Sequence, residues 1–292
     1  AAECHHMRKT AELALALLAA AVLTACADDG SNNTAFETGG PENGPPELVH
    51  VHGLGVNPAN NMLYVATHNG LYRLNEGVPE LVGGRYWDVM GFTVRGPDNF
   101  IGGGHPSLNE IREGRYPPLL GFIETNDGGA SWEILAMRGE ADLHAFAVDG
   151  DAIYAVDSTS GRVLASSDGR SWEARSGVRA LSLAAKEDGR ILATTEVGLL
   201  ESTDGARTWT APAGAPPVLL VASQPGTVTW GVSSDGGVFR DGGGAGWQRV
   251  GSVAGRPEAF GASADRLFAA TGEGIFESSD GVSWIEVYAN PE

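Results

Sequence analysis

The chain has 292 residues, 42% of them hydrophobic, and carries a formal net charge of −18. So acidic a protein argues against a nucleic-acid partner, because phosphate binding requires clustered lysine and arginine, and against electrostatic attachment to anionic lipid. Its two cysteines, Cys4 and Cys26, provide neither a disulfide framework nor a cysteine metal site.

The first segment has the sequence pattern of an export signal. Residues 1–6 precede Met7 and are left out of the reasoning about the fold. Two basic residues follow, and then an apolar run over residues 11–25 that is too short to span a membrane comfortably. Its end, Leu23-Thr24-Ala25-Cys26, resembles the bacterial lipobox, in which the cysteine is lipidated and becomes the mature N-terminus. Residues 1–26 are therefore predicted to be leader and lipoprotein signal peptide, with Cys26 anchored on the outer side of the cytoplasmic membrane; the alternative is an ordinary cleaved signal.

The next segment, residues 27–47, is rich in Asp, Asn, Gly, Pro and Thr, and Phe36 is its only large apolar residue. Such a composition cannot bury enough surface to fold and predicts a disordered acidic tether. About twenty residues of this kind reach roughly 25 Å. We expect the lipid to be the protein's only contact with the membrane.

From residue 48 onward the chain shows strand signals and no long stretch of helical period. Short apolar runs, such as residues 62–67 and 70–74, alternate with turn residues. Aligned on these runs, six units cover residues 48–83, 86–138, 141–176, 178–213, 216–251 and 257–289. Each unit offers four strands, so residues 48–292 are predicted to form one all-β domain, a six-bladed β-propeller. A seventh blade hidden in the second unit is the alternative.

A short turn sequence repeats through these units. One copy is Ser166-Ser167-Asp168-Gly169-Arg170-Ser171-Trp172, and a degenerate copy runs from Phe239 to Trp247. In the four good copies the central aspartates are Asp127, Asp168, Asp204 and Asp280, and the closing tryptophans are Trp132, Trp172, Trp209 and Trp284. Aspartate, serine and threonine bond backbone N–H groups in tight turns, and a tryptophan ring buries a large area. The aspartates are therefore predicted to be structural and the tryptophans largely buried.

The pattern resembles the Asp-box, or bacterial neuraminidase repeat (S-x-D-x-G-x-x-W), of the sialidase-like β-propellers, over roughly residues 47–289. The resemblance implies that each box lies on the hairpin between the third and fourth strands of a blade, away from the active face. It also implies a candidate activity, the exo-acting hydrolysis of sialic acid or another glycoside. The chain lacks the Phe/Tyr-Arg-Ile-Pro motif that carries the first substrate-binding arginine of that family. No catalytic residue is therefore assigned.

Stacking the repeats places five histidines on one face. The residue at the start of each first strand, taken round the ring, is His52, Met90, His144, Arg179, Val218 and Glu258. His68 and His105 are equivalent residues at the end of the second strand, and His50 lies two residues before His52 on the same side of its strand. We therefore expect His50, His52, His68, His105 and His144 to face one mouth of the channel, with Met90 among them.

Imidazole is the commonest metal ligand among protein side chains, and several histidines at one mouth suit zinc or copper. A thioether such as that of Met90 would favour Cu(I). The sequence leaves two alternatives open. The histidines line a site for an organic ligand, or they are ordinary polar groups at a channel mouth and form no site.

The one long insertion, residues 106–120, joins the second and third strands of the second unit and is expected to project from the same face as the histidines. It supplies Arg115 and Tyr116, and its position predicts a lid or a recognition loop. These two residues, with Arg179 and Glu258 of the ring, are the candidate ligand-binding residues. The sequence predicts a monomeric, lipid-anchored binding module of the cell envelope, whose partner at the histidines is a metal, a small ligand or an envelope protein. A glycoside hydrolase of the sialidase superfamily is the alternative.

Overall fold

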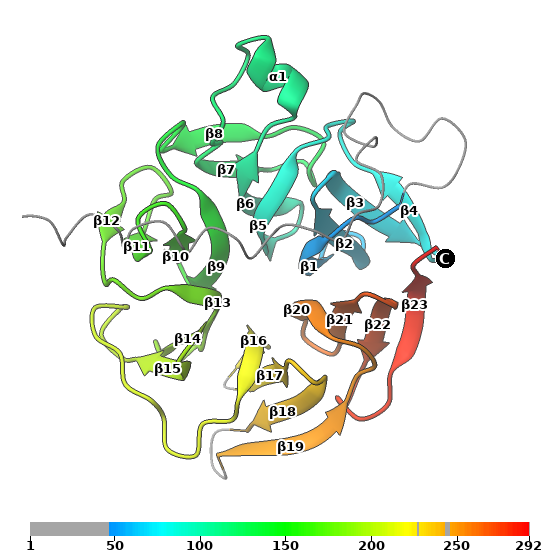
Figure 1. Ribbon diagram of the computed structural model, residues 1–292, viewed down its shortest axis with the longest axis vertical. Helices are drawn as coiled ribbons and strands as arrows, with labels where there is room; N and C mark the ends of the chain where they lie inside the picture. The colour runs from blue at the N-terminus through cyan, green and yellow to red at the C-terminus, as the bar shows by residue number, and fades with distance from the viewer. Residues whose placement is uncertain (1–46, 227, 243–245, 292) are drawn as a thin grey trace, which may run out of the picture. The chain divides into compact units, whose positions relative to one another are not determined.

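The computed structural model describes residues 47–226, 228–242 and 246–291. The chain divides into two units, Ala1–Glu42 and Asn43–Glu292. The predicted signal peptide, Cys26 and nearly all of the predicted tether lie outside the described residues. The second unit is an all-β, six-bladed propeller, as predicted (Figure 1). Within the described residues, no helix combines the length and the apolar character that a membrane crossing requires.

The first three blades are built as follows. Blade 1 consists of β1 (Val51–Asn57), β2 (Met62–Thr67), β3 (Gly70–Asn75) and β4 (Val78–Leu81). Blade 2 consists of β5 (Asp88–Gly96), β6 (Asn99–His105), β7 (Phe122–Thr125) and β8 (Glu133–Ala136), with the short helix α1 (Leu108–Arg112) between β6 and β7. Blade 3 consists of β9 (Leu143–Asp149), β10 (Ala152–Asp157), β11 (Arg162–Ser166) and β12 (Glu173–Ala174).

The other three blades complete the ring. Blade 4 consists of β13 (Ala180–Ala185), β14 (Ile191–Thr195) and β15 (Gly198–Ser202), and its fourth strand is reduced to a bridge between Glu201 and Thr210. Blade 5 consists of β16 (Val218–Ser223), β17 (Thr229–Ser233), β18 (Gly237–Asp241) and β19 (Trp247–Ser252). Blade 6 consists of β20 (Pro257–Ala262), β21 (Leu267–Thr271), β22 (Gly274–Ser278) and β23 (Ile285–Ala289).

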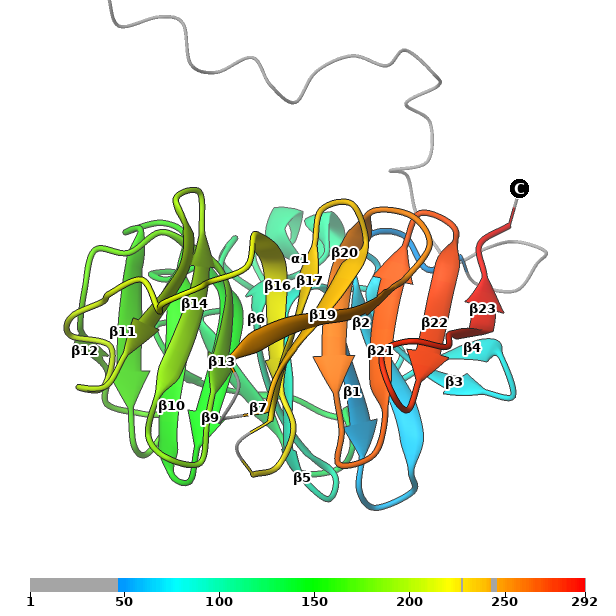
Figure 2. The ribbon, with the colours of Figure 1, turned by 90° about the horizontal axis from the view of Figure 1, so that it is seen from below.

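The first strand of each blade lies innermost and contacts the first strands of both neighbouring blades (Figure 1). Small residues allow this convergence. A Cβ added at Gly91 would lie 2.6 Å from the Phe146 ring of the next blade, and one at Gly261 would lie 2.5 Å from the carbonyl oxygen of Leu54. In the side view, β1 and β20 both run away from the face that carries α1 (Figure 2).

Each seam between neighbouring blades holds one apolar cluster. At the seam of blades 2 and 3, Phe122 packs with Leu143 and Phe146, and the ring of Trp172 lies 5.0 Å from that of Phe122. The closing tryptophans pack against the apolar clusters with the larger part of each residue buried, which is consistent with the prediction. These tryptophans are Trp132, Trp172, Trp209 and Trp284. Each packs against the apolar cluster of one seam and keeps part of its surface in solvent.

The repeated turns join the third and fourth strand positions of their blades. Asp168 accepts hydrogen bonds from the backbone N–H groups of Arg170 at 2.8 Å and Ser171 at 2.7 Å. Bonds from the backbone of Ser171 and Arg170 lower the pKa of Asp168 to about 2, and bonds from the Thr208 side chain and backbone lower the pKa of Asp204 to about 2. Equivalent bonds are made by Asp127 and Asp280.

The degenerate fifth copy is displaced by two residues. Its Asp241 is the last residue of β18 and pairs with Thr229, so it occupies the place of Ser166 and Ser202 in their blades. It is buried and lies 2.6 Å from the ammonium group of Lys186. Lys186 belongs to blade 4 and is 1% exposed. A buried ion pair therefore crosses the seam between blades 4 and 5.

The ring closes without a shared sheet, because each blade is one continuous segment of the chain. At the closing seam, Leu48 and Tyr72 of the first segment pack with Phe268 and Tyr288 of blade 6. The backbone N–H of Leu48 also donates a hydrogen bond of 3.4 Å to the Tyr288 hydroxyl. Side-chain packing at this seam therefore replaces a common β-ladder.

Candidate metal centre

The starts of the first strands and the ends of the second strands share one face, because the two strands of each pair are antiparallel. Val51 pairs with Thr67 in blade 1, and Asp88 pairs with His105 in blade 2. We call this side the histidine face, after His52, His68, His105 and His144. Two groups of side chains gather on it.

The first group contains His52 on β1, His68 in the turn after β2, and Asp88 at the start of β5. The His52 Nε2 atom lies 3.3 Å from Asp88 Oδ1, and the His68 Nδ1 atom lies 2.8 Å from Asp88 Oδ2. One donor atom from each residue falls within 4.8 Å of the others. The group therefore spans the seam between blades 1 and 2.

The second group contains His105 at the end of β6, Asp142 just before β9, and His144 on β9. Asp142 Oδ1 lies 3.4 Å from His105 Nε2, and Asp142 Oδ2 lies 2.9 Å from His144 Nε2. The Ser158 hydroxyl donates a 2.6 Å hydrogen bond to Asp142 Oδ2. Burial alone would raise the pKa of Asp142, but the polar contacts of His144 and Ser158 and the nearby imidazoles lower the pKa below its usual value.

The two groups are related by the propeller repeat. The pair His68–Asp88 and the pair His105–Asp142 each join the end of a second strand to the start of the next blade. The third member differs, because His52 comes from the earlier blade of its seam, whereas His144 comes from the later blade of its own. The corresponding residue of the blade between them is the half-buried Met90 on β5. Since Asp88 and His105 are paired residues of β5 and β6, the two groups are neighbours.

Four buried polar atoms in these groups have no hydrogen-bond partner among the described residues. They are His52 Nε2, Asp88 Oδ1, Asp142 Oδ1 and His144 Nε2. His144 Nε2 is close to the Asp142 carboxylate, but the contact does not have the direction of a hydrogen bond. Leaving a buried donor or acceptor unsatisfied costs about 1–3 kcal/mol, so native proteins keep such atoms few. Each of the four lies 2.9–3.4 Å from an oppositely charged group of its own cluster, so what these atoms lack is a well-directed partner.

The orientation of His105 is fixed from the side away from Asp142. Its Nδ1 atom lies 2.9 Å from the carbonyl oxygen of Pro118, which can only accept, so Nδ1 carries a proton and Nε2 is directed toward Asp142. The preceding residue, Gly104, has φ +136°, and a Cβ there would lie 2.0 Å from the Asp88 carbonyl oxygen. Only glycine fits this junction of the two groups.

The insertion that supplies Pro118 is itself held in place. Ser107 caps α1, and Glu110 within the helix accepts a 2.8 Å hydrogen bond from the buried Trp87 indole. The predicted ligand residue Tyr116 packs edge-on against Trp87, with ring centroids 5.4 Å apart. The predicted ligand residue Arg115 lies 2.7 Å from Glu113 Oε2. Both residues contact other residues of the insertion or its base, and neither belongs to the two His–Asp groups.

The remaining predicted site residues lie around these groups. His50 is exposed, with a left-handed φ of 48°, and its ring centroid lies 6.3 Å from that of His68; it belongs to neither group. Arg179 lies over Gly161 of blade 3. The prediction that Arg179 and Val218 take the ring position of His52 and His144 is wrong, because the register shift that marks this position falls on Leu181 in β13 and on Leu219 in β16. Glu258 lines a hollow on the opposite half of the mouth.

Sequence reasoning missed both aspartates as metal ligands. Asp88 and Asp142 stand two residues before Met90 and His144, as His50 stands before His52. Comparing the residues that stand two positions before His52, Met90 and His144 in their blades would have found both aspartates.

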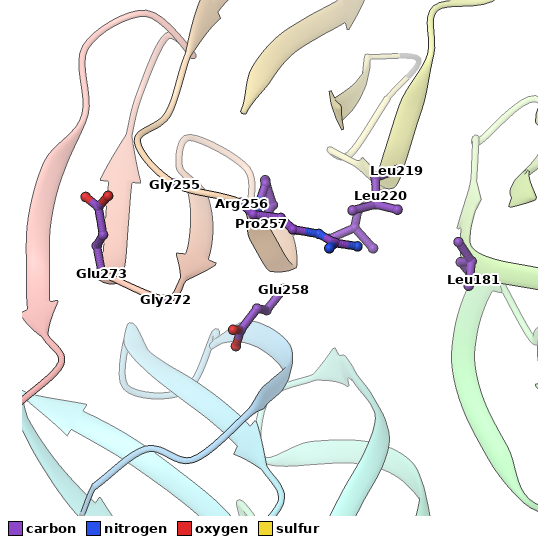
Figure 3. A pocket seen from close by; sticks show the side chains of 9 residues that line it. All are labelled: Leu181, Leu219, Leu220, Gly255, Arg256, Pro257, Glu258, Gly272 and Glu273. Atoms are coloured by element: carbon purple, nitrogen blue, oxygen red, sulfur yellow. The ribbon is translucent and has the colours of Figure 1, made fainter. Parts of the chain in front are cut away.

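The other half of the mouth, formed by blades 4 to 6, contains a hollow of about 680 Å³ (Figure 3). Its lining is Leu181, Leu219, Leu220, Gly255, Arg256, Pro257, Glu258, Gly272 and Glu273. No histidine contributes to it. We call it the leucine hollow.

Comparisons with known proteins agree on the architecture. A family model described as "DUF6242 beta propeller domain" matches residues 120–223. The match and the structure identify a β-propeller domain. No curated protein matches the chain.

Several solved structures share the fold. An ancestral GH74 enzyme is 15% identical over 85% of this chain and 40% of its own, with a TM-score of 0.55. A chain of a nidogen/laminin complex is 12% identical over 77% of this chain and 93% of its own, with a TM-score of 0.58. Virginiamycin B lyase from Staphylococcus aureus is 12% identical over 84% and 86%, with a TM-score of 0.53. This chain spans two fifths of the GH74 enzyme, and identities this low show the fold alone.

Proposed function

We propose that this propeller is a metal-binding module of the cell envelope that holds zinc or copper in the two His–Asp groups of the histidine face. The observation that carries the proposal is the set of four buried donor and acceptor atoms without hydrogen-bond partners. A bound cation would satisfy the carboxylate oxygens and the imidazole lone pairs together.

The distances within the groups support this proposal. Ligands held about 2.0–2.1 Å from a tetrahedral zinc ion lie about 3.3 Å from one another. The four nitrogen–oxygen separations in the two groups are 3.3, 2.8, 3.4 and 2.9 Å. Small side-chain movements would therefore admit an ion to either group.

The donor set favours zinc over Cu(I). Each group offers two imidazoles and one carboxylate, which resembles three-ligand zinc sites that keep a fourth position open for water or a ligand. Copper remains the alternative through Met90, whose thioether is a soft ligand. The bonds of His105 to Pro118 and of Asp142 to Ser158 would hold these ligands in place, as outer-sphere partners do in metal sites.

Glycoside hydrolysis by a sialidase-like mechanism is less well supported. It requires three arginines gathered around one carboxylate. Here Arg115 is paired with Glu113, Arg179 lies over Gly161, and Arg256 lines the leucine hollow. The three arginines therefore lie in three different places and do not form one carboxylate-binding cluster.

The cellular location belongs to the same proposal. The sequence Leu23-Thr24-Ala25-Cys26 supports lipid attachment at Cys26 on the outer side of the cytoplasmic membrane. Cys26→Ser is expected to move the protein from the membrane fraction to the soluble fraction, because the acidic domain has no other membrane affinity. A Cys26→Ser protein that stays with the membrane would contradict the lipid anchor. It would not affect the proposal of metal binding.

Metal binding is tested by titrating zinc, and separately copper, into detergent-solubilised full chain at neutral pH. We expect two ions per chain in the His–Asp groups. The double variant His52→Ala/Asp88→Asn should lose one ion, and His105→Ala/Asp142→Asn the other. His50→Ala is the matched control, because His50 lies outside both groups, and it should keep both ions. Uptake of neither metal, or equal uptake by all variants, would overturn the proposal.

A further inference from the structure

The leucine hollow is separate from the His–Asp groups and has the size of a ligand site. Its volume of about 680 Å³ falls within the roughly 300–1,000 Å³ typical of sites for small organic molecules. It lies at the starts of β13, β16 and β20, so it opens on the same face as the histidines (Figure 3).

One wall of the hollow is apolar although it faces solvent. Leu181 is 55% exposed, and Leu219 and Leu220 are half-buried. Exposed aliphatic side chains gathered in a concave site favour an occupant with an aliphatic body.

The hollow also contains charges of both signs that are unpaired. Among the described residues, Arg256 makes no ion pair or hydrogen bond through its guanidinium group, and the carboxylates of Glu258 and Glu273 are likewise without partners. All three side chains are exposed. Arg256 extends toward Leu220, whereas Glu258 points to the opposite side, toward blade 1 (Figure 3).

These charges decide between classes of ligand. A simple anion would meet two carboxylates and a protein of net charge −18. A simple cation would meet the guanidinium group of Arg256. A molecule that carries one charge of each sign avoids both conflicts, because its carboxylate can lie against Arg256 and its ammonium group against Glu258 or Glu273.

We infer that the leucine hollow binds an aliphatic zwitterion, that is, a short peptide with apolar side chains, whose ammonium and carboxylate groups lie at opposite ends and can reach opposite sides of the hollow. The carboxylate binds Arg256, the ammonium group binds the glutamates, and the aliphatic body covers the leucines. This site shares no residue with the proposed metal sites.

The probes are the dipeptide leucyl-leucine and free leucine, titrated into the full chain by calorimetry. Binding of leucyl-leucine supports the inference. Free leucine, whose two charged groups share one carbon atom, should bind at least about tenfold more weakly, and equal binding of leucine would overturn the assignment. N-acetyl-leucyl-leucine lacks the ammonium group and leucyl-leucinamide lacks the carboxylate, so each should bind at least about tenfold more weakly than leucyl-leucine. Equal binding of these analogues would overturn the inference, as would no binding of either probe at millimolar concentration.

Variants give an independent check. Arg256→Gln and Glu258→Gln should each weaken leucyl-leucine binding at least about tenfold. Arg170→Gln is the matched control, because Arg170 is exposed on a repeated turn at the other face, and it should bind like the unaltered chain. Undiminished binding by Arg256→Gln would refute the assignment. Zinc uptake by the same variants should not change. The ligand proposal and the metal proposal are therefore tested independently.

Discussion

The two halves of one channel mouth show how little of a propeller's chemistry is set by its backbone. Blades 1 to 3 present His52, Met90 and His144 at the start of their innermost strands, with an aspartate two residues before Met90 and another two residues before His144. Blades 4 to 6 present Leu181, Leu219 and Glu258 at the same places, around a leucine-lined hollow. The first two strands of every blade pair in the same way in both halves. The difference teaches that a few exposed side chains at strand ends decide which ligand each half accepts.

The seams differ from one another as well. Repeated turns built on an aspartate lie in blades 2, 3, 4 and 6. Blade 5 has the buried pair Lys186–Asp241 at the corresponding place. The predictions below test these two differences, from the largest expected effect to the smallest.

The largest effect is expected at the seam between blades 4 and 5. Lys186→Met leaves the Asp241 carboxylate buried without its cation, so the free energy of unfolding should fall by about 3–5 kcal/mol. Replacing both partners, with Lys186→Met/Asp241→Leu, should recover most of that loss. Arg73→Met, which breaks the exposed pair with Glu80, is the control and should cost less than about 1 kcal/mol. Chemical denaturation measures all three. A single variant no weaker than the control would show that this seam does not depend on the pair.

The second prediction concerns the division of the mouth. Asp142→Asn removes an anionic ligand that contacts both His105 and His144, so zinc affinity at the second group should fall more than about a hundredfold. Glu258→Gln, the corresponding loss of one carboxylate from the leucine hollow, should leave zinc affinity unchanged. Competition with a chromophoric chelator gives both values. Equal losses in the two variants would mean that the halves are not separate sites.

The third prediction concerns the support of the histidine face by the insertion. Glu110→Ala leaves the buried Trp87 indole without its acceptor, which should cost about 1–3 kcal/mol of unfolding free energy. Because the insertion also carries the Pro118 carbonyl that orients His105, zinc affinity at the second group should fall about tenfold. Glu113→Ala is the control, since it alters an exposed residue of the same insertion. A stability loss with unchanged zinc affinity would show that the insertion does not position His105.

The smallest effect is expected at the turns. The pKa of Asp168 is lowered from 3.8 to about 2 in the folded protein. A group with a depressed folded pKa contributes stability that is present above the unfolded value and is lost as the pH falls through the folded value. The stability difference between the unaltered chain and Asp168→Asn should therefore be constant above pH 4 and shrink between pH 4 and pH 2. Urea unfolding at pH 5, 3 and 2 checks this, and a difference that does not change with pH would refute it.

The fold was predictable because its signals are local and repeated. Each turn sequence around Asp127, Asp168, Asp204 and Asp280 fixes one hairpin, and the nearly even spacing of Trp132, Trp172, Trp209, Trp247 and Trp284 marks the repeat. The fraction of each tryptophan that stays exposed was not predictable, because it depends on the side chains that the neighbouring blade packs against the ring. The displacement of Asp241 was hidden as well, since its partner Lys186 lies in another blade.

The site was predictable only in part. Alignment of the repeats pointed to His52, His68, His105 and His144 because those positions recur at strand ends. The aspartates that join them lie at or just before the strand starts, where the hydrophobic pattern that guides the alignment stops. The division of the histidines into two groups depends on which seam each side chain enters, and a strand pattern does not contain that information.

The way in which the ring closes has a consequence for engineering. Every blade is complete within one stretch of chain, and only side chains such as Leu48 and Tyr288 join the last blade to the first. A circular permutant that opens the loop between two other blades, and links the present closing seam with a short flexible peptide, would cut no β-ladder. The chain could therefore begin at any of the blades. The order of the blades in the gene would change, and the arrangement of side chains at the channel mouth would be kept.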